Sequence, residues 1–138
     1  MEIRYLNTDF DLVASSHLQP LVSALRAYGL RALHVTLGGD GLWYSILETE
    51  EDYDEPDGTI GAMLAAIESL EDDAAREWSA CRLREFNIGY DCGDDPWAFN
   101  NELTNDTLRR IAALGASLRI TIYPQRPEKK RADEPQTQ

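Results

Sequence analysis

Apolar and polar side chains alternate in five short stretches of the chain, which is the pattern of strands that bury one face. In residues 33–37, for example, three aliphatic side chains alternate with His34 and Thr36. The stretches with this pattern are residues 3–10, 33–37, 42–46, 86–90 and 118–122. A glycine-rich link, residues 38–41, joins the second stretch to the third, so we expect these two strands to form a β-hairpin.

Between these strands, apolar residues recur at three- and four-residue spacing, which predicts amphipathic helices. The first helix is expected to begin after Ser16, because Ser16 and Gln19 match the Ser-x-x-Gln capping box, and to end at Gly29. The second is expected to have Thr59 as its N-cap and to run through Leu70. Two further helices are expected from Asp72 or Asp73 to about Arg82 and from Thr104 or Asn105 to Gly115.

With the two helices expected between residues 59 and 82 counted as one helical element, the predicted order is β-α-β-β-α-β-α-β, whose first six elements have the split βαβ order of a ferredoxin-like core. Because each helix and each strand has one apolar face, we expect an α+β fold with the helices on one face of a mostly antiparallel sheet of about five strands. In this prediction residues 1–123 form a single domain. Residues 124–138 contain three prolines and no large apolar side chain, so we expect them to be a disordered tail.

The chain of 138 residues is strongly acidic, with 13 basic against 25 acidic residues and a net charge of −12. Residues 124–138 hold four basic and three acidic residues, so residues 1–123 carry −13. Such a charge disfavours nucleic acids and anionic membranes as partners, because both are themselves negative. No apolar run approaches the ~20 residues of a membrane span, and Met1 is followed by Glu-Ile-Arg rather than by a signal core, so we expect a cytoplasmic protein.

Many of the acidic residues are concentrated in residues 48–57, and others surround two aromatic side chains in the long connection 91–104. The candidate partner-binding residues are Glu48, Glu50, Glu51, Asp52, Asp54, Glu55, Asp57, Asp94, Asp95, Trp97 and Phe99. A run of acids is commonly a solvated loop, but concentrated negative charge also steers basic proteins, and large aromatics beside acids are typical of interfaces. The alternative for Trp97 and Phe99 is that they pack into the core beneath the loop.

No group of residues has the spacing of a catalytic or metal site. His17 and His34 lack the nucleophile and orienting group that acid–base or nucleophilic catalysis requires. Cys81 and Cys92 do not have the Cys-x-x-Cys spacing of zinc sites. A calcium loop starting at Asp91 would place a proline where an EF-hand needs glycine. We therefore expect no metal, no cofactor and no catalytic residue.

The C-terminal half contains Arg-Glu-Phe-Asn-Ile-Gly-Tyr at 84–90, Leu-Thr-Asn at 103–105 and Leu-Gly-Ala-Ser-Leu-Arg-Ile-Thr-Ile-Tyr at 114–123. These segments resemble a family of small bacterial α+β domains of unknown function. The chain is more weakly similar to acidic immunity proteins, which are encoded beside polymorphic toxins. That similarity implies a protein-binding inhibitor, and it transfers no catalytic residue.

The leading hypothesis is therefore a non-enzymatic, acidic protein-binding domain that acts as an immunity-type inhibitor of a basic protein partner. The alternative is an uncharacterised enzyme or small-ligand-binding domain with a site near His34, where acids such as Asp40 would act with the imidazole. A third hypothesis is a domain that associates with itself through an exposed strand edge.

Overall fold

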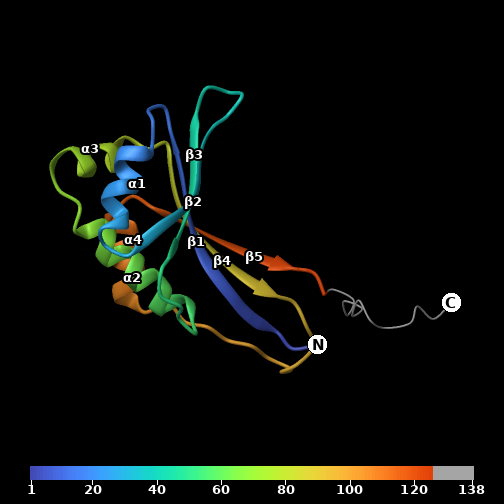
Figure 1. Ribbon diagram of the computed structural model, residues 1–138. Coiled ribbons are helices and arrows are strands. Elements are labelled where there is room, and N and C mark those ends of the chain that lie inside the picture. The colour runs from blue at the N-terminus through green and yellow to red at the C-terminus, as the bar shows by residue number, and fades with distance from the viewer. Residues whose placement is uncertain (126–138) are drawn as a thin grey trace.

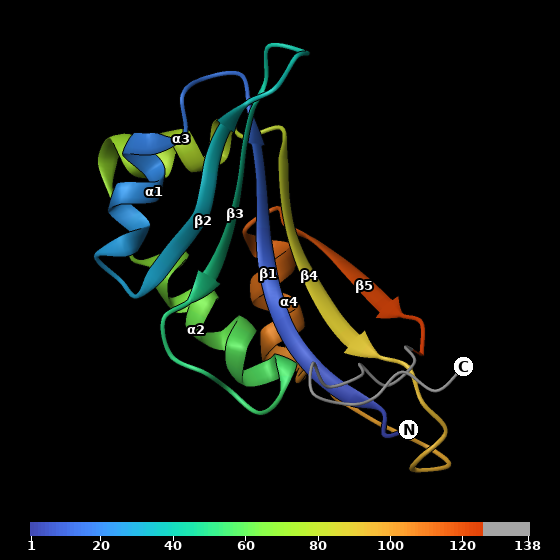
Figure 2. The same cartoon turned by 45° about the vertical axis from the view of Figure 1, so that its right-hand side comes forward.

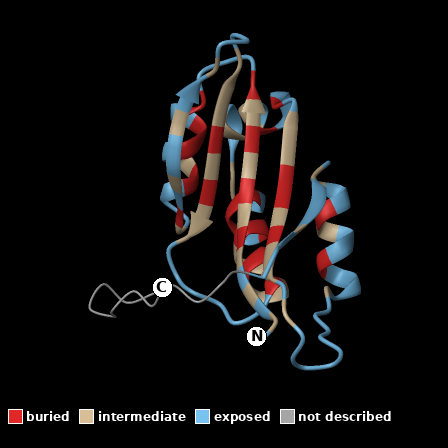
Figure 3. Cartoon of the chain, turned by 90° about the vertical axis from the view of Figure 1, so that its right-hand side faces the viewer, coloured by how far each residue is buried: buried red, intermediate tan, exposed pale blue. Residues whose placement is uncertain are grey.

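Four helices lie on one side of a five-stranded sheet and leave its other side open (Figure 1, Figure 3). The computed structural model describes residues 1–125, and these counts refer to that part of the chain. The strands are β1 (Arg4–Ala14), β2 (Leu30–Leu37), β3 (Trp43–Thr49), β4 (Leu83–Asp91) and β5 (Ser117–Tyr123). The helices are α1 (Gln19–Arg26), α2 (Pro56–Glu68), α3 (Asp72–Ala80) and α4 (Asn105–Ala113). The α+β class is confirmed, but the order of elements differs from the predicted one, because two separate helices, α2 and α3, lie between β3 and β4 where the predicted order counts one helical element. The expected disordered tail, residues 124–138, lies almost entirely outside the described residues.

The strand order in the sheet is β2-β3-β1-β4-β5, with β1 at the centre. The β2–β3, β3–β1 and β1–β4 pairs are antiparallel, and the β4–β5 pair is parallel. The sheet is therefore mixed rather than mostly antiparallel as expected. The reason is that the connection containing α4 carries the chain from the end of β4 back to the opposite end of the sheet, which is the crossover that a parallel neighbour requires.

Of the three predicted N-caps at α1, α2 and α4, the structure confirms one and contradicts two. Of the two expected starts of α4, Thr104 is the N-cap, since its side chain accepts a hydrogen bond at 3.2 Å from the backbone amide three residues further on. The predicted Ser16 cap of α1 is wrong, because Leu18 is the N-cap residue and makes no side-chain bond. The predicted Thr59 cap of α2 is also wrong, because the helix begins at Pro56, whose fixed φ favours a first turn.

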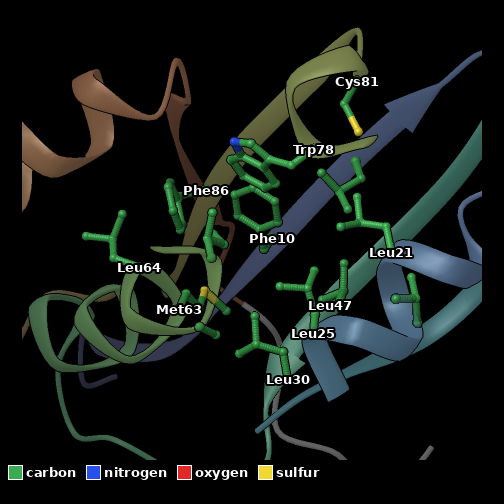
Figure 4. Close-up of a cluster of buried hydrophobic side chains, with 14 of the residues drawn as sticks. Phe10, Leu21, Leu25, Leu30, Leu47, Met63, Leu64, Trp78, Cys81 and Phe86 are labelled. Atoms are coloured by element: carbon green, nitrogen blue, oxygen red, sulfur yellow. The ribbon is translucent and has the colours of Figure 1, made fainter. Parts of the chain in front are cut away.

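The main core lies between the sheet and the helices, where aromatic side chains contact one another (Figure 4). Phe10 of β1 stacks on Trp78 of α3 with ring centroids 5.2 Å apart, and it meets Phe86 of β4 edge to face at 4.6 Å. Such aromatic pairs each add about 0.5–1.5 kcal/mol beyond the area they bury. Because buried residues alternate along β1, the residues between them face the open side of the sheet.

Candidate functional site

Residues 50–55, which we call the acidic loop, connect β3 to α2 and expose all of their acidic side chains. These residues are Glu50, Glu51, Asp52, Asp54 and Glu55. Glu51 accepts a long hydrogen bond, at 3.5 Å, from the hydroxyl of Tyr53. The other four side chains form no hydrogen bond or ion pair with any residue of 1–125. The acidic loop is thus a concentration of negative charge that forms no ion pair within residues 1–125.

The two ends of the predicted acidic segment have structural contacts instead. Glu48 of β3 accepts a hydrogen bond at 2.8 Å from Nε of Arg31 on the neighbouring strand β2, and the two side chains form an ion pair. Asp57, in the first turn of α2, accepts the backbone N–H of Thr104 at 2.9 Å. This bond ties the start of α2 to the start of α4. Glu48 and Asp57 therefore support the fold and are less available to a partner.

The two predicted acids of residues 92–104, which connect β4 to α4, contact the N-terminal segment. The Met1 ammonium group lies 2.8 Å from the Asp94 carboxylate, and this pairing lowers the pKa of Asp94. The backbone carbonyl of Asp95 accepts the Ile3 amide at 2.7 Å. These contacts hold the N-terminal segment against the start of the connection.

The two aromatic side chains of this connection have opposite environments. Phe99 packs edge to face against Tyr90 of β4, with ring centroids 5.9 Å apart, and it is 36% exposed. Trp97 is 99% exposed. The alternative in which both aromatics pack into the core is therefore wrong for Trp97. A fully exposed indole is a large apolar surface in water, and tryptophan is enriched among the residues that dominate binding energy in protein interfaces.

The fold brings the acidic loop and the 92–104 connection to the same end of the sheet (Figure 2). β1 begins at this end, and its antiparallel neighbours β3 and β4 both finish there. The two predicted segments, which are far apart in the sequence, thus share one end of the molecule. The Asp57–Thr104 hydrogen bond joins the helices that follow them.

Sequence reasoning missed two half-buried carboxylates, Asp9 and Asp11, on the open face of the central strand β1. Their carboxylate neighbours on the adjoining strands each have an arginine. These ion pairs are Glu48 with Arg31 and Glu85 with Arg119. Asp9 and Asp11 form no ion pair with any residue of 1–125. The centre of the open face therefore carries two negative charges without a paired cation.

The surroundings of Asp9 and Asp11 disfavour their ionised forms. Burial is the main cause of the raised pKa of both carboxyls, and neighbouring acids raise it further: Glu48 at Asp9, and Asp9 and Glu85 at Asp11. The signal for this pair was present in the sequence. In Thr-Asp-Phe-Asp-Leu, residues 8–12, the two acids alternate with residues that face the core, and the alternation places them on one face of a strand.

His34 and Asp40, the residues of the alternative ligand site, are not hydrogen-bonded to each other. Asp40 lies at the turn of the β2–β3 hairpin, where bonds from the Tyr44 hydroxyl and from a backbone amide lower its pKa. Nδ1 of His34 lies 3.0 Å from the hydroxyl of Thr36. His34 borders two open grooves, one of about 520 Å³ that it shares with Asp11 and one of about 1170 Å³ that it shares with Glu50.

The two cysteines are both free. Burial raises the pKa of the Cys81 thiol to about 11, so this thiol stays protonated at neutral pH. Cys92 is exposed. Within residues 1–125, no three His, Cys, Asp or Glu side chains form a group that could hold a metal ion. None of the helices in this range combines the length and apolar character needed to cross a membrane.

Comparison of the chain with protein-family models, with curated proteins and with solved structures gave no match in any of the three. The resemblance to small bacterial α+β domains and to immunity proteins therefore stays a prediction. The function has to be inferred from the surfaces described above.

Proposed function

We propose that this chain is a non-enzymatic protein-binding domain that docks a basic partner through the end of the sheet that carries the acidic loop and Trp97. The observation that carries the proposal is the set of four exposed carboxylates in residues 50–55 that have no hydrogen bond or ion pair within residues 1–125. Like charges held in one loop repel one another, and a cationic surface relieves that repulsion on contact. The charge therefore favours a partner rich in lysine or arginine.

The acidic loop and Trp97 make different contributions to such a complex. The loop sets the association rate, since electrostatic steering raises association rate constants by about 10- to 1000-fold at low salt. Trp97 sets the lifetime, because truncating a tryptophan hot spot typically costs about 2 kcal/mol or more. Asp9 and Asp11 give the open face of the sheet the same preference for cations, so a large basic partner can use both surfaces.

The finer form of this proposal is an immunity-type inhibitor, a small bacterial domain that covers the active surface of a basic toxin in the cytoplasm. The two free cysteines fit a reducing compartment. A ferredoxin-like core formed by β1 to β4 fits the order β2-β3-β1-β4, and such a core leaves one face of the sheet open for a partner.

Affinity capture from the native host tests this proposal, with the full chain as bait at about 50 mM and about 300 mM salt. Mass spectrometry identifies the captured protein, and the purified pair is then measured at both salt concentrations. We expect a basic protein whose Kd rises at least about tenfold at the higher salt, because exposed charges are screened over a shorter distance. A captured partner of acidic composition, or a Kd that is the same at both salt concentrations, would contradict the proposal.

Matched double variants then locate the contact. Asp52→Asn with Asp54→Asn removes two charges from the acidic loop, and Glu71→Gln with Asp72→Asn removes two near the start of α3, away from this end of the sheet (Figure 1). We expect the loop variant to weaken binding at least about fivefold, mainly through the association rate, and the α3 variant to change it less than about twofold. Trp97→Ala should raise the dissociation rate instead. Equal effects of the two double variants would place the contact elsewhere.

A second candidate function, small-ligand binding, is favoured by the groove that contains His34, Asp11, Thr36 and Tyr44. A library of small cationic compounds, screened by the shifts of backbone amide signals in NMR, tests it. The groove predicts hits that shift the signals of β1 and β2 and that Asp11→Asn abolishes. Hits that cluster at no single site, or that survive Asp11→Asn, would contradict this function.

A further inference from the structure

The edge strand β5 exposes a row of aliphatic side chains that the helix layer does not cover. Leu118, Ile120 and Ile122 are 38%, 60% and 64% exposed. Their Cα partners on β4 are Phe86, Ile88 and Tyr90. Because Phe86 and Ile88 belong to the core, the row faces the same side of the sheet as the helices, yet the helices stop short of β5 (Figure 2). The row is a continuation of the core that lacks a cover.

One end of the row opens into a pocket of about 360 Å³ between β5 and the 92–104 connection. Its walls include Ile3, Tyr90, Phe99, Ile120 and Ile122. Apolar surface left in water costs about 25 cal/mol per Å², and contiguous apolar patches on protein surfaces mark interaction sites. The row and the pocket together form a surface that favours burial against another apolar surface.

The two edges of the sheet differ in how well they are protected against an added strand. β2, at the other edge, has a bulge between Ala32 and His34, and bulges disfavour strand addition. β5 keeps a regular register along its whole length. Each edge strand carries an arginine that is paired with a glutamate of the neighbouring strand, Arg31 with Glu48 on β2 and Arg119 with Glu85 on β5. The β5 edge therefore differs from the β2 edge in lacking the bulge that disfavours pairing.

The charge around β5 favours a second copy of this chain as the occupant. Residues 105–125 hold three arginines and one aspartate. Each arginine already has a carboxylate, in the pairs Arg109 with Asp106, Arg110 with Glu68 and Arg119 with Glu85. This edge is thus close to neutral on a chain with a net charge of −12. Two copies repel each other elsewhere but not here, and a strongly charged partner would find no counter-charge.

We propose that β5 pairs antiparallel with β5 of a second copy, so that two chains form a symmetric dimer with one continuous sheet. A two-fold axis perpendicular to the sheet relates the two strands, which makes the contact isologous. This axis puts the two rows of Leu118, Ile120 and Ile122 side by side on one face, where each removes the other from water. Residues 126–138 contain no large apolar side chain that could cover the row instead. The acidic loop follows β3, on the far side of β1 from β5, and stays accessible in the dimer.

Sedimentation velocity of the full chain in reducing buffer, from about 1 to about 100 µM, tests the proposal. We expect a reversible shift from the mass of one chain to that of two. Ile120→Lys, at an exposed position of β5, should raise the dimer Kd at least about tenfold. Leu33→Lys on β2 makes the same change of charge at a residue that is 54% exposed, and it should leave the dimer intact. Circular dichroism and thermal unfolding confirm that each variant is folded.

Hydrogen exchange at low and high concentration shows whether the strands themselves pair. Backbone amides of β5 that point away from β4 should exchange quickly at low concentration and become protected as the dimer forms. If sedimentation velocity gave the mass of a single chain at every concentration, the proposal would be overturned. The β5 edge would then be available to a strand of another protein. A dimer that survives Ile120→Lys, that Leu33→Lys breaks, or that leaves the β5 amides unprotected would overturn it as well.

Discussion

Asp11 is a half-buried carboxylate that accepts no side-chain hydrogen bond from any residue of 1–125. Its neighbours Asp9 and Glu85 are also acidic, and the charges of Arg119 and His34 offset only part of their effect. Ionised Asp11 is therefore less favourable in the folded chain than in the unfolded chain, where water surrounds it. A bound cation on the open face would relieve this unfavourable state.

The Asp11→Asn variant is expected to be more stable than the wild type at pH 7, by about 0.5 kcal/mol. Because folding raises the pKa of Asp11, its ionisation lowers stability above that pKa, and this loss disappears as the pH falls through it. Asparagine does not titrate, so the difference should narrow between pH 7 and about pH 4. Urea unfolding across this range measures it. A variant that is less stable at pH 7 would show that the carboxylate holds the fold.

Substitutions at Thr59 test whether α2 begins at this residue, as the sequence predicts, or at Pro56, as in the structure. Its hydroxyl lies 2.8 Å from that of Tyr5, and the residue is 1% exposed. At an N-cap, aspartate is as good as threonine, so Thr59→Asp would leave stability nearly unchanged. Inside the helix the same change buries a carboxylate, and we expect a loss of about 3 kcal/mol or more. Thermal unfolding measures the loss, and Thr59→Ser, which keeps the hydroxyl, should cost about 1 kcal/mol.

At the level of elements, α2 and α4 are joined by a bidentate ion pair. Nε and Nη2 of Arg110 donate to the two carboxylate oxygens of Glu68 at 3.0 and 2.6 Å, and the arginine lowers the pKa of Glu68. The bond from the Thr104 amide to Asp57 joins the same helices at their starts. These contacts fix α4, and α4 in turn sets the point at which the chain enters β5.

Glu68→Gln is expected to lower the free energy of unfolding by about 0.5 kcal/mol at pH 7, as for other exposed ion pairs. Because folding lowers the pKa of Glu68, its contribution is present above the ordinary glutamate pKa and is lost as the pH falls through the folded value. Wild type and variant should therefore converge near about pH 3 in urea unfolding. Asp73→Asn, which removes an ion pair with Arg76 within one helix, should cost less. If Asp73→Asn lowered the free energy of unfolding as much as Glu68→Gln does, the result would contradict a stabilising contact between α2 and α4.

Elements whose ends depend on local chemistry were predictable, and those that depend on distant contacts were not. The β2–β3 hairpin and the Thr104 cap follow from residues close together in the sequence. Thr59 has the residue type of a cap, but its hydroxyl bonds to Tyr5, which lies 54 positions away. The parallel pairing of β5 depends on the path of the chain through α4, which hydrophobic periodicity does not encode.

The candidate site likewise has parts that could be predicted from the sequence and parts that depend on distant contacts. Composition was enough to predict an acidic segment at residues 48–57, of which the structure exposes residues 50–55 as a loop. It could not predict that Glu48 and Asp57 are held by Arg31 and Thr104, because those contacts come from a neighbouring strand and a distant helix. The alternation in residues 8–12 places Asp9 and Asp11 on one face of a strand, but only the register of the sheet shows that Glu85 lies opposite Asp11.

The negative charge of the whole molecule is unevenly distributed. Unpaired carboxylates lie in the acidic loop at one end of the sheet and at the centre of its open face, whereas the charges around β5 are paired. Electrostatic repulsion therefore opposes folding most where the acids have no cation, and it opposes association least at the β5 edge. The same distribution supports a basic partner at one surface and a second copy at another.

Neutralising the acidic loop is expected to stabilise the isolated chain while it weakens partner binding. The variant carries Glu50→Gln, Asp52→Asn, Asp54→Asn and Glu55→Gln. Without these mutually repelling charges, the free energy of unfolding should rise by about 1 kcal/mol at low salt. The gain should vanish at about 0.5 M salt, where the Debye length is only about 4 Å. Thermal unfolding at the two salt concentrations measures it.

The control for this variant is Asp73→Asn with Asp106→Asn, which removes carboxylates that are already paired with Arg76 and Arg109. It should lower stability, because each substitution leaves an arginine without its partner. If the loop variant also loses stability, the loop acids hold the conformation of the loop itself. The negative charge at this end of the sheet would then have a structural cause, and the reason to connect it with a basic partner would disappear.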